Sequence, residues 1–129
     1  TKYASLLGEK LRSANIRVWL LNTGYTGGVY GVGKRMSLPH TRALITEALN
    51  GNLDKVEFET HPVFGVSMPK TCPNVPAEIL NPRNTWASKE AYDAKANELA
   101  AAFNKNFEKF ASKSEKEILD AAPKVMQSA

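Results

Sequence analysis

The chain has 129 residues with 43% hydrophobic and 23% charged residues, a composition typical of one globular domain rather than of a disordered or collagen-like chain. The formal net charge of +4 comes from scattered residues, so we expect no nucleic-acid partner. The longest apolar run, at 18–21, is far too short to span a membrane, and a single cysteine excludes an internal disulfide.

The opening of the chain predicts a helix followed by a strand. Apolar residues recur every three or four positions over 3–14, and charged residues occupy the other side. No capping residue precedes this pattern, so we expect further residues upstream of Thr1. Residues 16–21 then form an apolar run that only Arg17 interrupts, which predicts a strand buried on both faces, with a short buried helix as the alternative.

Residues 22–34 are rich in glycine, and a second helix follows them. Glycines at this density let the backbone adopt positive φ and approach a ligand or another segment closely. Ser37 or Leu38 begins the predicted helix, with Pro39 in its first turn and Gly51 as its stop. The order is therefore helix, strand, glycine-rich loop, helix.

Two short strands and a long loop are predicted next. Apolar and polar residues alternate over 56–58 and again over 64–68, with His61 and Pro62 between the two runs. Residues 69–86 are rich in proline and predict an irregular connection with one helical turn at 77–80.

The last part of the chain predicts two helices. Ser88 caps a long helix that runs to about Ala111, and we expect its aromatic stripe to face the core. Ser114 and Glu117 have the spacing of a capping box for a final short helix.

The glycine-rich loop is the first candidate for a ligand site. Residues 28–34 fit the first seven places of a phosphate-binding P-loop and lie between a strand and a helix. The next place should be Ser or Thr to hold magnesium, but it is Arg35, and the helix begins only after Ser37. Three interpretations remain open: a true P-loop, a glycine-rich turn without a ligand, and a nucleotide site that uses the loop and helix start differently.

Lys34, Arg35 and the helix start at 37–41 are the second candidate. An arginine plane can stack on a purine base, and the Thr41 hydroxyl can hydrogen-bond a base edge. The alternative is that these residues are a solvated helix start. No catalytic set is expected elsewhere. We interpret Glu57 with Glu59 as a solvated strand edge, Cys72 as a passive thiol and His40 as a surface or capping residue.

Several motifs together resemble the ATP-dependent phosphoenolpyruvate carboxykinases. They are VWLLNTGYTGG at 18–28, YGVGKRM at 30–36, HTRA at 40–43 and EILNPRNTW at 78–86. Shorter matches fill the intervals at 1–4, 49–51, 56–58, 62–65 and 106–107. The resemblance covers essentially the whole chain, in order and with little room for insertions.

The resemblance implies a reaction and a place in a longer enzyme. Members of the family convert oxaloacetate and ATP to phosphoenolpyruvate, ADP and carbon dioxide with Mg²⁺ and Mn²⁺. Their P-loop, their metal ligands (a Lys, a His and an Asp) and their oxaloacetate-binding arginine are expected upstream of these residues, which makes 28–34 a false P-loop. In the family an arginine, the aliphatic residue after it and a threonine five residues further contact the base. The matching residues are Arg35, Met36 and Thr41, where Met36 replaces the isoleucine of some members but keeps an apolar wall.

We therefore expect an α/β fold in which 1–129 is the C-terminal part of the carboxykinase's mononucleotide-binding domain, with few strands and flanking helices. The expected function is the adenine-side portion of this gluconeogenic enzyme, inactive by itself. The alternatives are a non-catalytic nucleotide-binding or oligomerisation module and an enzyme of another class that uses 28–34 on phosphates. ATP is the expected partner, oxaloacetate or phosphoenolpyruvate would bind through the missing region, and homo-oligomerisation is left open.

The glycine-rich loop is more similar to the plant, yeast and trypanosomatid members, which are often oligomeric, than to the enteric bacterial ones. We expect a cytoplasmic location, with the glycosome as the alternative for a trypanosomatid source. Residues 127–129, Gln-Ser-Ala, show no peroxisomal-type tripeptide, although a truncated end would hide one.

Overall fold

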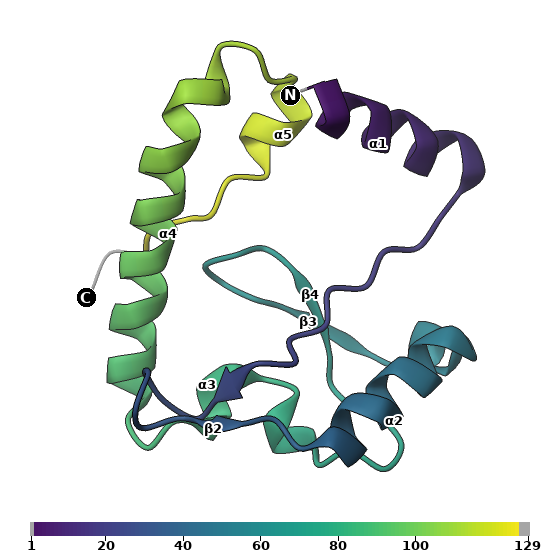
Figure 1. The fold of residues 1–129 in the computed structure, drawn as a ribbon, viewed down its shortest axis with the longest axis vertical. Helices are drawn as coiled ribbons and strands as arrows, with labels where there is room; N and C mark the ends of the chain where they lie inside the picture. Colours follow the sequence, from purple (N-terminus) through teal and green to yellow (C-terminus); the bar gives the residue numbers. More distant parts are fainter. Residues whose placement is uncertain (1, 127–129) are drawn as a thin grey trace.

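The computed structural model describes residues 2–126, so that Thr1 of the opening motif and the terminal tripeptide 127–129 lie outside the described residues. Three long helices, α1 (Lys2–Ala14), α2 (Leu38–Leu49) and α4 (Lys89–Ala111), surround a small β-hairpin in the middle of the molecule (Figure 1). Short helices complete the chain: the 3-10 turns η1 (Asn52–Lys55) and η2 (Ala77–Ile79), and α3 (Pro82–Thr85) and α5 (Lys116–Asp120). The fold is thus mixed, with helices and a few short strands.

The strands form two separate antiparallel pairs. β1 (Tyr25–Thr26) pairs with β2 (Lys34–Arg35), and β3 (Phe58–Thr60) pairs with β4 (Ser67–Pro69). The β3–β4 hairpin confirms two short strands in the region 56–68, but both lie further along the chain than predicted: β3 begins at Phe58 and β4 begins at Ser67.

Residues 16–21 form neither the buried strand nor the buried helix that their apolar run predicts. They have no regular structure, and Val18 and Leu20 are 61% and 85% exposed. A strand exists only through hydrogen bonds to a neighbour, and within residues 2–126 both ladders lie elsewhere. The segment instead crosses the molecule as a connection, held by an ion pair between Arg17 and Asp54.

The starts of α2 and α4 are set by local capping, as predicted. The Ser37 side chain accepts a hydrogen bond from the His40 N–H at the start of α2, and Gly51 follows the helix with φ +72°. Ser88 accepts from the Ala91 N–H at 3.0 Å and begins α4. The helical turn predicted at 77–80 is also present, as η2.

The capping box predicted for the last helix is wrong. The Ser114 hydroxyl donates to the Phe110 carbonyl at 2.9 Å, so it ends α4 and does not begin α5. Glu115 is the N-cap of α5 and makes no side-chain capping bond. The helix itself forms over Lys116–Asp120, close to its predicted position.

The buried core is small and divided. Leu53, Cys72 and Val75 form one cluster beneath α2, while Val63 packs against Ala96 and Ala100 of α4 in the other. The aromatic stripe of α4 (Phe103, Phe107 and Phe110) is expected to face the core, but the buried residues of this helix are Ala96 and Ala100, and Phe107 is half-buried. Phe103 and Phe110 are 51% and 41% exposed, which corrects the expectation for both. No helix among the described residues is long and apolar enough to cross a membrane.

Candidate functional site

The glycine-rich segment folds as a β-hairpin rather than as a P-loop. Tyr25 pairs with Arg35 and Thr26 pairs with Lys34, so that 27–33 closes the hairpin. A P-loop would lead directly from its glycines into the start of a helix. Here β2 intervenes, and α2 begins only at Leu38.

The predicted base-contact residues follow one another from this hairpin into α2. Arg35 is exposed on β2, and the Met36 N–H donates to the Gly24 carbonyl at 2.9 Å. Thr41 lies in the first turn of α2, where its N–H donates to the Ser37 carbonyl at 3.1 Å. Thr41 is 8% exposed, which contradicts the interpretation of this residue as solvated helix surface.

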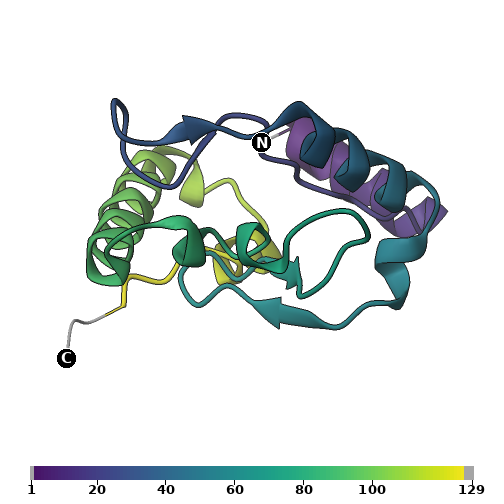
Figure 2. The same cartoon turned by 90° about the horizontal axis from the view of Figure 1, so that it is seen from below.

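The hairpin is docked on α3 by a contact that the sequence did not reveal. The hydroxyl oxygens of Thr26 and Thr85 lie 3.1 Å apart, although the two residues are separated by 59 positions. A Cβ on Gly27 would lie 3.2 Å from the Thr85 carbonyl oxygen, so the two backbones approach closely. Both views place the hairpin loop beside the start of α4, where α3 also lies (Figures 1 and 2).

α3 in turn is tied to α4 by charged groups. The Arg83 guanidinium donates to both carboxylate oxygens of Asp93, at 2.8 and 2.9 Å. These hydrogen bonds hold the pKa of Asp93 below its usual value. The Lys89 ammonium donates to the Arg83 carbonyl at 2.9 Å, near the C-terminal end of α3. α3, within the EILNPRNTW motif, therefore contacts the glycine-rich hairpin on one side and α4 on the other.

The acidic pair on β3 and its flank is exposed, and the single cysteine is buried. Glu57 and Glu59 are exposed and bond to Lys70 and Asn81 respectively. Cys72 is 6% exposed, and burial raises the pKa of its thiol, which disfavours the reactive thiolate. Within residues 2–126 there is no group of three or more His, Cys, Asp or Glu side chains that could hold a metal ion.

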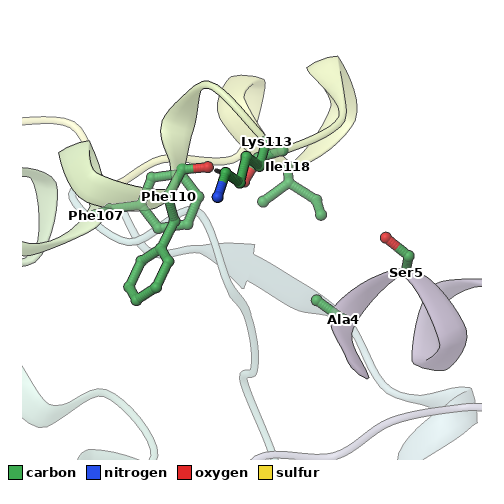
Figure 3. A pocket seen from close by; sticks show the side chains of 7 residues that line it. Ala4, Ser5, Phe107, Phe110, Lys113 and Ile118 are labelled. Carbon is green, nitrogen blue, oxygen red and sulfur yellow. Dashed lines mark hydrogen bonds between the residues drawn. The ribbon is translucent and has the colours of Figure 1, made fainter. Parts of the chain in front are cut away.

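An apolar cavity of about 260 Å³ lies elsewhere, between α1 and the junction of α4 with α5 (Figure 3). Ala4 and Ser5 line one side, and Phe107, Phe110 and Ile118 line the other. None of the three predicted base-contact residues borders it.

Residues 1–78 match the sequence profile of the phosphoenolpyruvate carboxykinase family. The chain is 58% identical over 123 residues to the phosphoenolpyruvate carboxykinase (ATP) of Flavobacterium johnsoniae, covering 95% of this chain and 23% of that protein. It is 64% identical over 108 residues to phosphoenolpyruvate carboxykinase (ATP) 1 of Moorella thermoacetica, covering 84% of this chain and 21% of that protein. It is 54% identical over 122 residues to the phosphoenolpyruvate carboxykinase (ATP) of Thermus thermophilus, covering 95% of this chain and 23% of that protein. The chain thus spans less than a quarter of the length of these relatives, and it belongs to the ATP-dependent phosphoenolpyruvate carboxykinase family.

Proposed function

We propose that this chain is the base-binding part of the ATP site in an ATP-dependent phosphoenolpyruvate carboxykinase, as the C-terminal part of its mononucleotide-binding domain. The whole enzyme would convert oxaloacetate and ATP to phosphoenolpyruvate, ADP and carbon dioxide. The observation that carries this proposal is the placement of Arg35, Met36 and Thr41 along one path from a strand into a capped helix. This path fixes the backbone of all three residues relative to one another.

The three side chains offer complementary contacts to a purine. Arg35 is exposed, and its planar cation can lie over the ring for about 0.5–2 kcal/mol. Met36 is half-buried and supplies an apolar wall. The Thr41 hydroxyl can bond a base edge for about 0.5–1.5 kcal/mol net, and its burial would shield that bond from water. Together these groups would hold the base and leave the phosphates to residues outside this chain.

If these residues contact only the base, their effect on each kinetic constant can be predicted. The base does not change during phosphoryl transfer, so its contacts stabilise the ground state and the transition state equally. The Mg²⁺ and Mn²⁺ that the family requires would be held by residues outside the chain. The 129 residues by themselves should accordingly show no formation of oxaloacetate from phosphoenolpyruvate, ADP and bicarbonate.

Alanine substitutions in a full-length carboxykinase that contains these residues test the proposal. Thr41→Ala should raise the KM for ATP by roughly ten-fold or less, and Arg35→Ala by a similar or larger factor, with kcat nearly unchanged. Arg12→Ala, on the exposed surface of α1, is the control for loss of a positive charge and should leave both constants unchanged.

Two outcomes would contradict this assignment. If neither Arg35→Ala nor Thr41→Ala moved the KM for ATP, the segment would have no role in binding the base. If Arg35→Ala lowered kcat strongly at saturating ATP, the arginine would act on the phosphates and the base-side assignment would be wrong.

We also propose a cytoplasmic location for the whole enzyme rather than a glycosomal one. The relatives from Flavobacterium, Moorella and Thermus are bacterial, whereas the glycosomal alternative requires a trypanosomatid source.

A further inference from the structure

The hydrogen bond between Thr26 and Thr85 has a defined direction. The Thr85 Oγ1 lies 2.7 Å from the Pro82 carbonyl oxygen and 3.1 Å from the Thr26 Oγ1. A carbonyl oxygen can only accept, and a hydroxyl has a single hydrogen to donate. Thr85 therefore donates to Pro82, and Thr26 donates to Thr85. Both hydroxyls are needed for the chain of bonds from β1 to α3.

The neighbouring backbone reinforces this contact. Gly27 has φ +82°, a conformation that favours glycine, and an added Cβ would lie 3.2 Å from the Thr85 carbonyl oxygen. β1 is thus held against the end of α3 by a hydrogen bond and by close backbone packing at adjacent residues.

The support beneath the hairpin is itself held in place. Arg83 of α3 makes two hydrogen bonds to Asp93, and Lys89 donates to the Arg83 carbonyl. A paired guanidinium and carboxylate with two parallel bonds fix both distance and orientation. α3 is therefore a fixed point on α4, the longest helix among the described residues.

A displacement of β1 would be transmitted to the base-contact residues. Arg35 is the ladder partner of Tyr25, the residue before Thr26. The Met36 N–H donates to the Gly24 carbonyl, just before β1. Arg35 and Met36 are thus linked through the backbone to the segment that Thr85 anchors.

We propose that Thr26 and Thr85 are a positioning pair that sets the orientation of Arg35 and Met36 toward the nucleotide base. This inference rests on the proposed function. Neither threonine contacts the base in this scheme: the pair acts by holding the β1–β2 hairpin against α3.

Thr26→Val in the full-length carboxykinase is the sharpest test, because it keeps the side-chain shape and leaves the bond from Thr85 to Pro82 intact. The KM for ATP should rise roughly three- to ten-fold with kcat unchanged. Thr26→Ser restores the hydroxyl and should bring the KM back close to its original value. Thr85→Val should weaken ATP binding to a similar or larger degree. Thr71→Val, at an exposed position, is the matched control and should change neither constant.

A double-mutant cycle separates positioning from a direct role or a general loss of stability. In an Arg35→Ala background, Thr26→Val should raise the KM for ATP by a clearly smaller factor than in the original enzyme, because one of the two residues that it positions is gone and only Met36 remains. Effects that multiply fully in the double variant would overturn the proposal, as would failure of Thr26→Ser to rescue.

Hydrogen exchange distinguishes failure of this inference from failure of the proposed function. Thr26→Val should speed exchange of the β1 and β2 amides several-fold, whether or not Arg35 binds a base. If Arg35→Ala leaves the KM for ATP unchanged, the proposed function fails. Amide hydrogen exchange in Thr26→Val then tests by itself whether Thr26 and Thr85 anchor the β1–β2 hairpin. Unchanged exchange in Thr26→Val would overturn the anchoring role.

Discussion

The Nε2 of His61 lies 2.7 Å from the Tyr92 hydroxyl, which joins the loop of the β3–β4 hairpin to α4 across 31 positions of sequence. On the other side of the ring, Nδ1 accepts the N–H groups of Val63 and Phe64, each at 3.2 Å. With Nδ1 acting as acceptor, neutral His61 carries its hydrogen on Nε2 and donates to Tyr92. One neutral imidazole thereby organises the loop and attaches it to the helix.

This arrangement predicts that the loop opens as the pH falls. His61 is 4% exposed, and burial lowers its pKa below 6.5, although the charges of Asp93 and Glu59 oppose the shift. The pKa of His61 is lower in the folded state than in the unfolded state. The contribution of neutral His61 to the stability of the fold is therefore present above about pH 6.5 and is lost as the pH falls through the folded-state pKa. Protonation of Nδ1 would displace the N–H groups of Val63 and Phe64. Their exchange rates in the full-length enzyme, corrected for intrinsic chemistry, should therefore rise as the pH falls below about 6.5.

Substitution of each histidine identifies the group responsible. His61→Gln should abolish the extra pH dependence of exchange at Val63 and Phe64. His40→Gln, at the start of α2, should retain it. Persistence of the pH dependence in His61→Gln would show that another group controls the loop.

Local signals allowed part of this fold to be predicted from the sequence. Ser37 and Ser88 cap their helices through contacts within three residues, so their positions could be located without knowledge of the rest of the chain. Ser114 has the same kind of signal but fails, because its hydroxyl donates to the Phe110 carbonyl of the preceding helix. A capping residue can serve either of two adjacent helices, and sequence spacing does not decide between them.

Contacts between distant segments could not be predicted in the same way. The apolar run at 16–21 indicates a buried strand, but a strand depends on a partner that the run does not specify. Arg35, Met36 and Thr41 are identified by a family resemblance and are close in sequence, whereas the hairpin that carries Arg35 contacts Thr85. A threonine hydroxyl pair 59 residues apart leaves no spacing pattern, so only the structure could reveal it.

Arg83 should control the titration of Asp93. The Arg83 guanidinium lowers the pKa of Asp93 mainly through its hydrogen bonds, and these are lost in Arg83→Gln. The pKa of Asp93 should then rise toward its ordinary value, as measured by carboxyl chemical shifts in an NMR titration. Lys70→Gln, which removes the partner of Glu57, should leave Asp93 unchanged. An unshifted Asp93 in Arg83→Gln would show that the two side chains are not paired in solution.

Two glycines of the β1–β2 hairpin should respond differently to alanine substitution. A Cβ on Gly33 would lie 2.7 Å from the Gly28 carbonyl oxygen and 3.0 Å from that of Thr26, so the strands must shift. Gly31 has φ +87° but open space around its Cα, so alanine there costs about 1–2 kcal/mol of backbone strain without a clash. Gly33→Ala should therefore raise the KM for ATP in the full-length enzyme, while Gly31→Ala should lower the melting temperature with a smaller effect on KM. Equal effects of both variants on KM would contradict the steric argument.

The isolated chain should self-associate, because much of its apolar surface has no cover within residues 2–126. Three consecutive apolar side chains are exposed: Val18 by 61%, Trp19 by 37% and Leu20 by 85%. In addition, no residue of α1 is buried. Contiguous exposed apolar residues of this kind drive association, whereas single ones are common on monomers. Sedimentation velocity of the 129-residue chain should show a mass that rises with concentration, and Leu20→Lys should reduce the association. Leu49→Lys introduces the same charge at an equally open position, 82% exposed at the end of α2, and should have the smaller effect. A concentration-independent monomer with a single cooperative melting transition would show that this surface is covered in some other way.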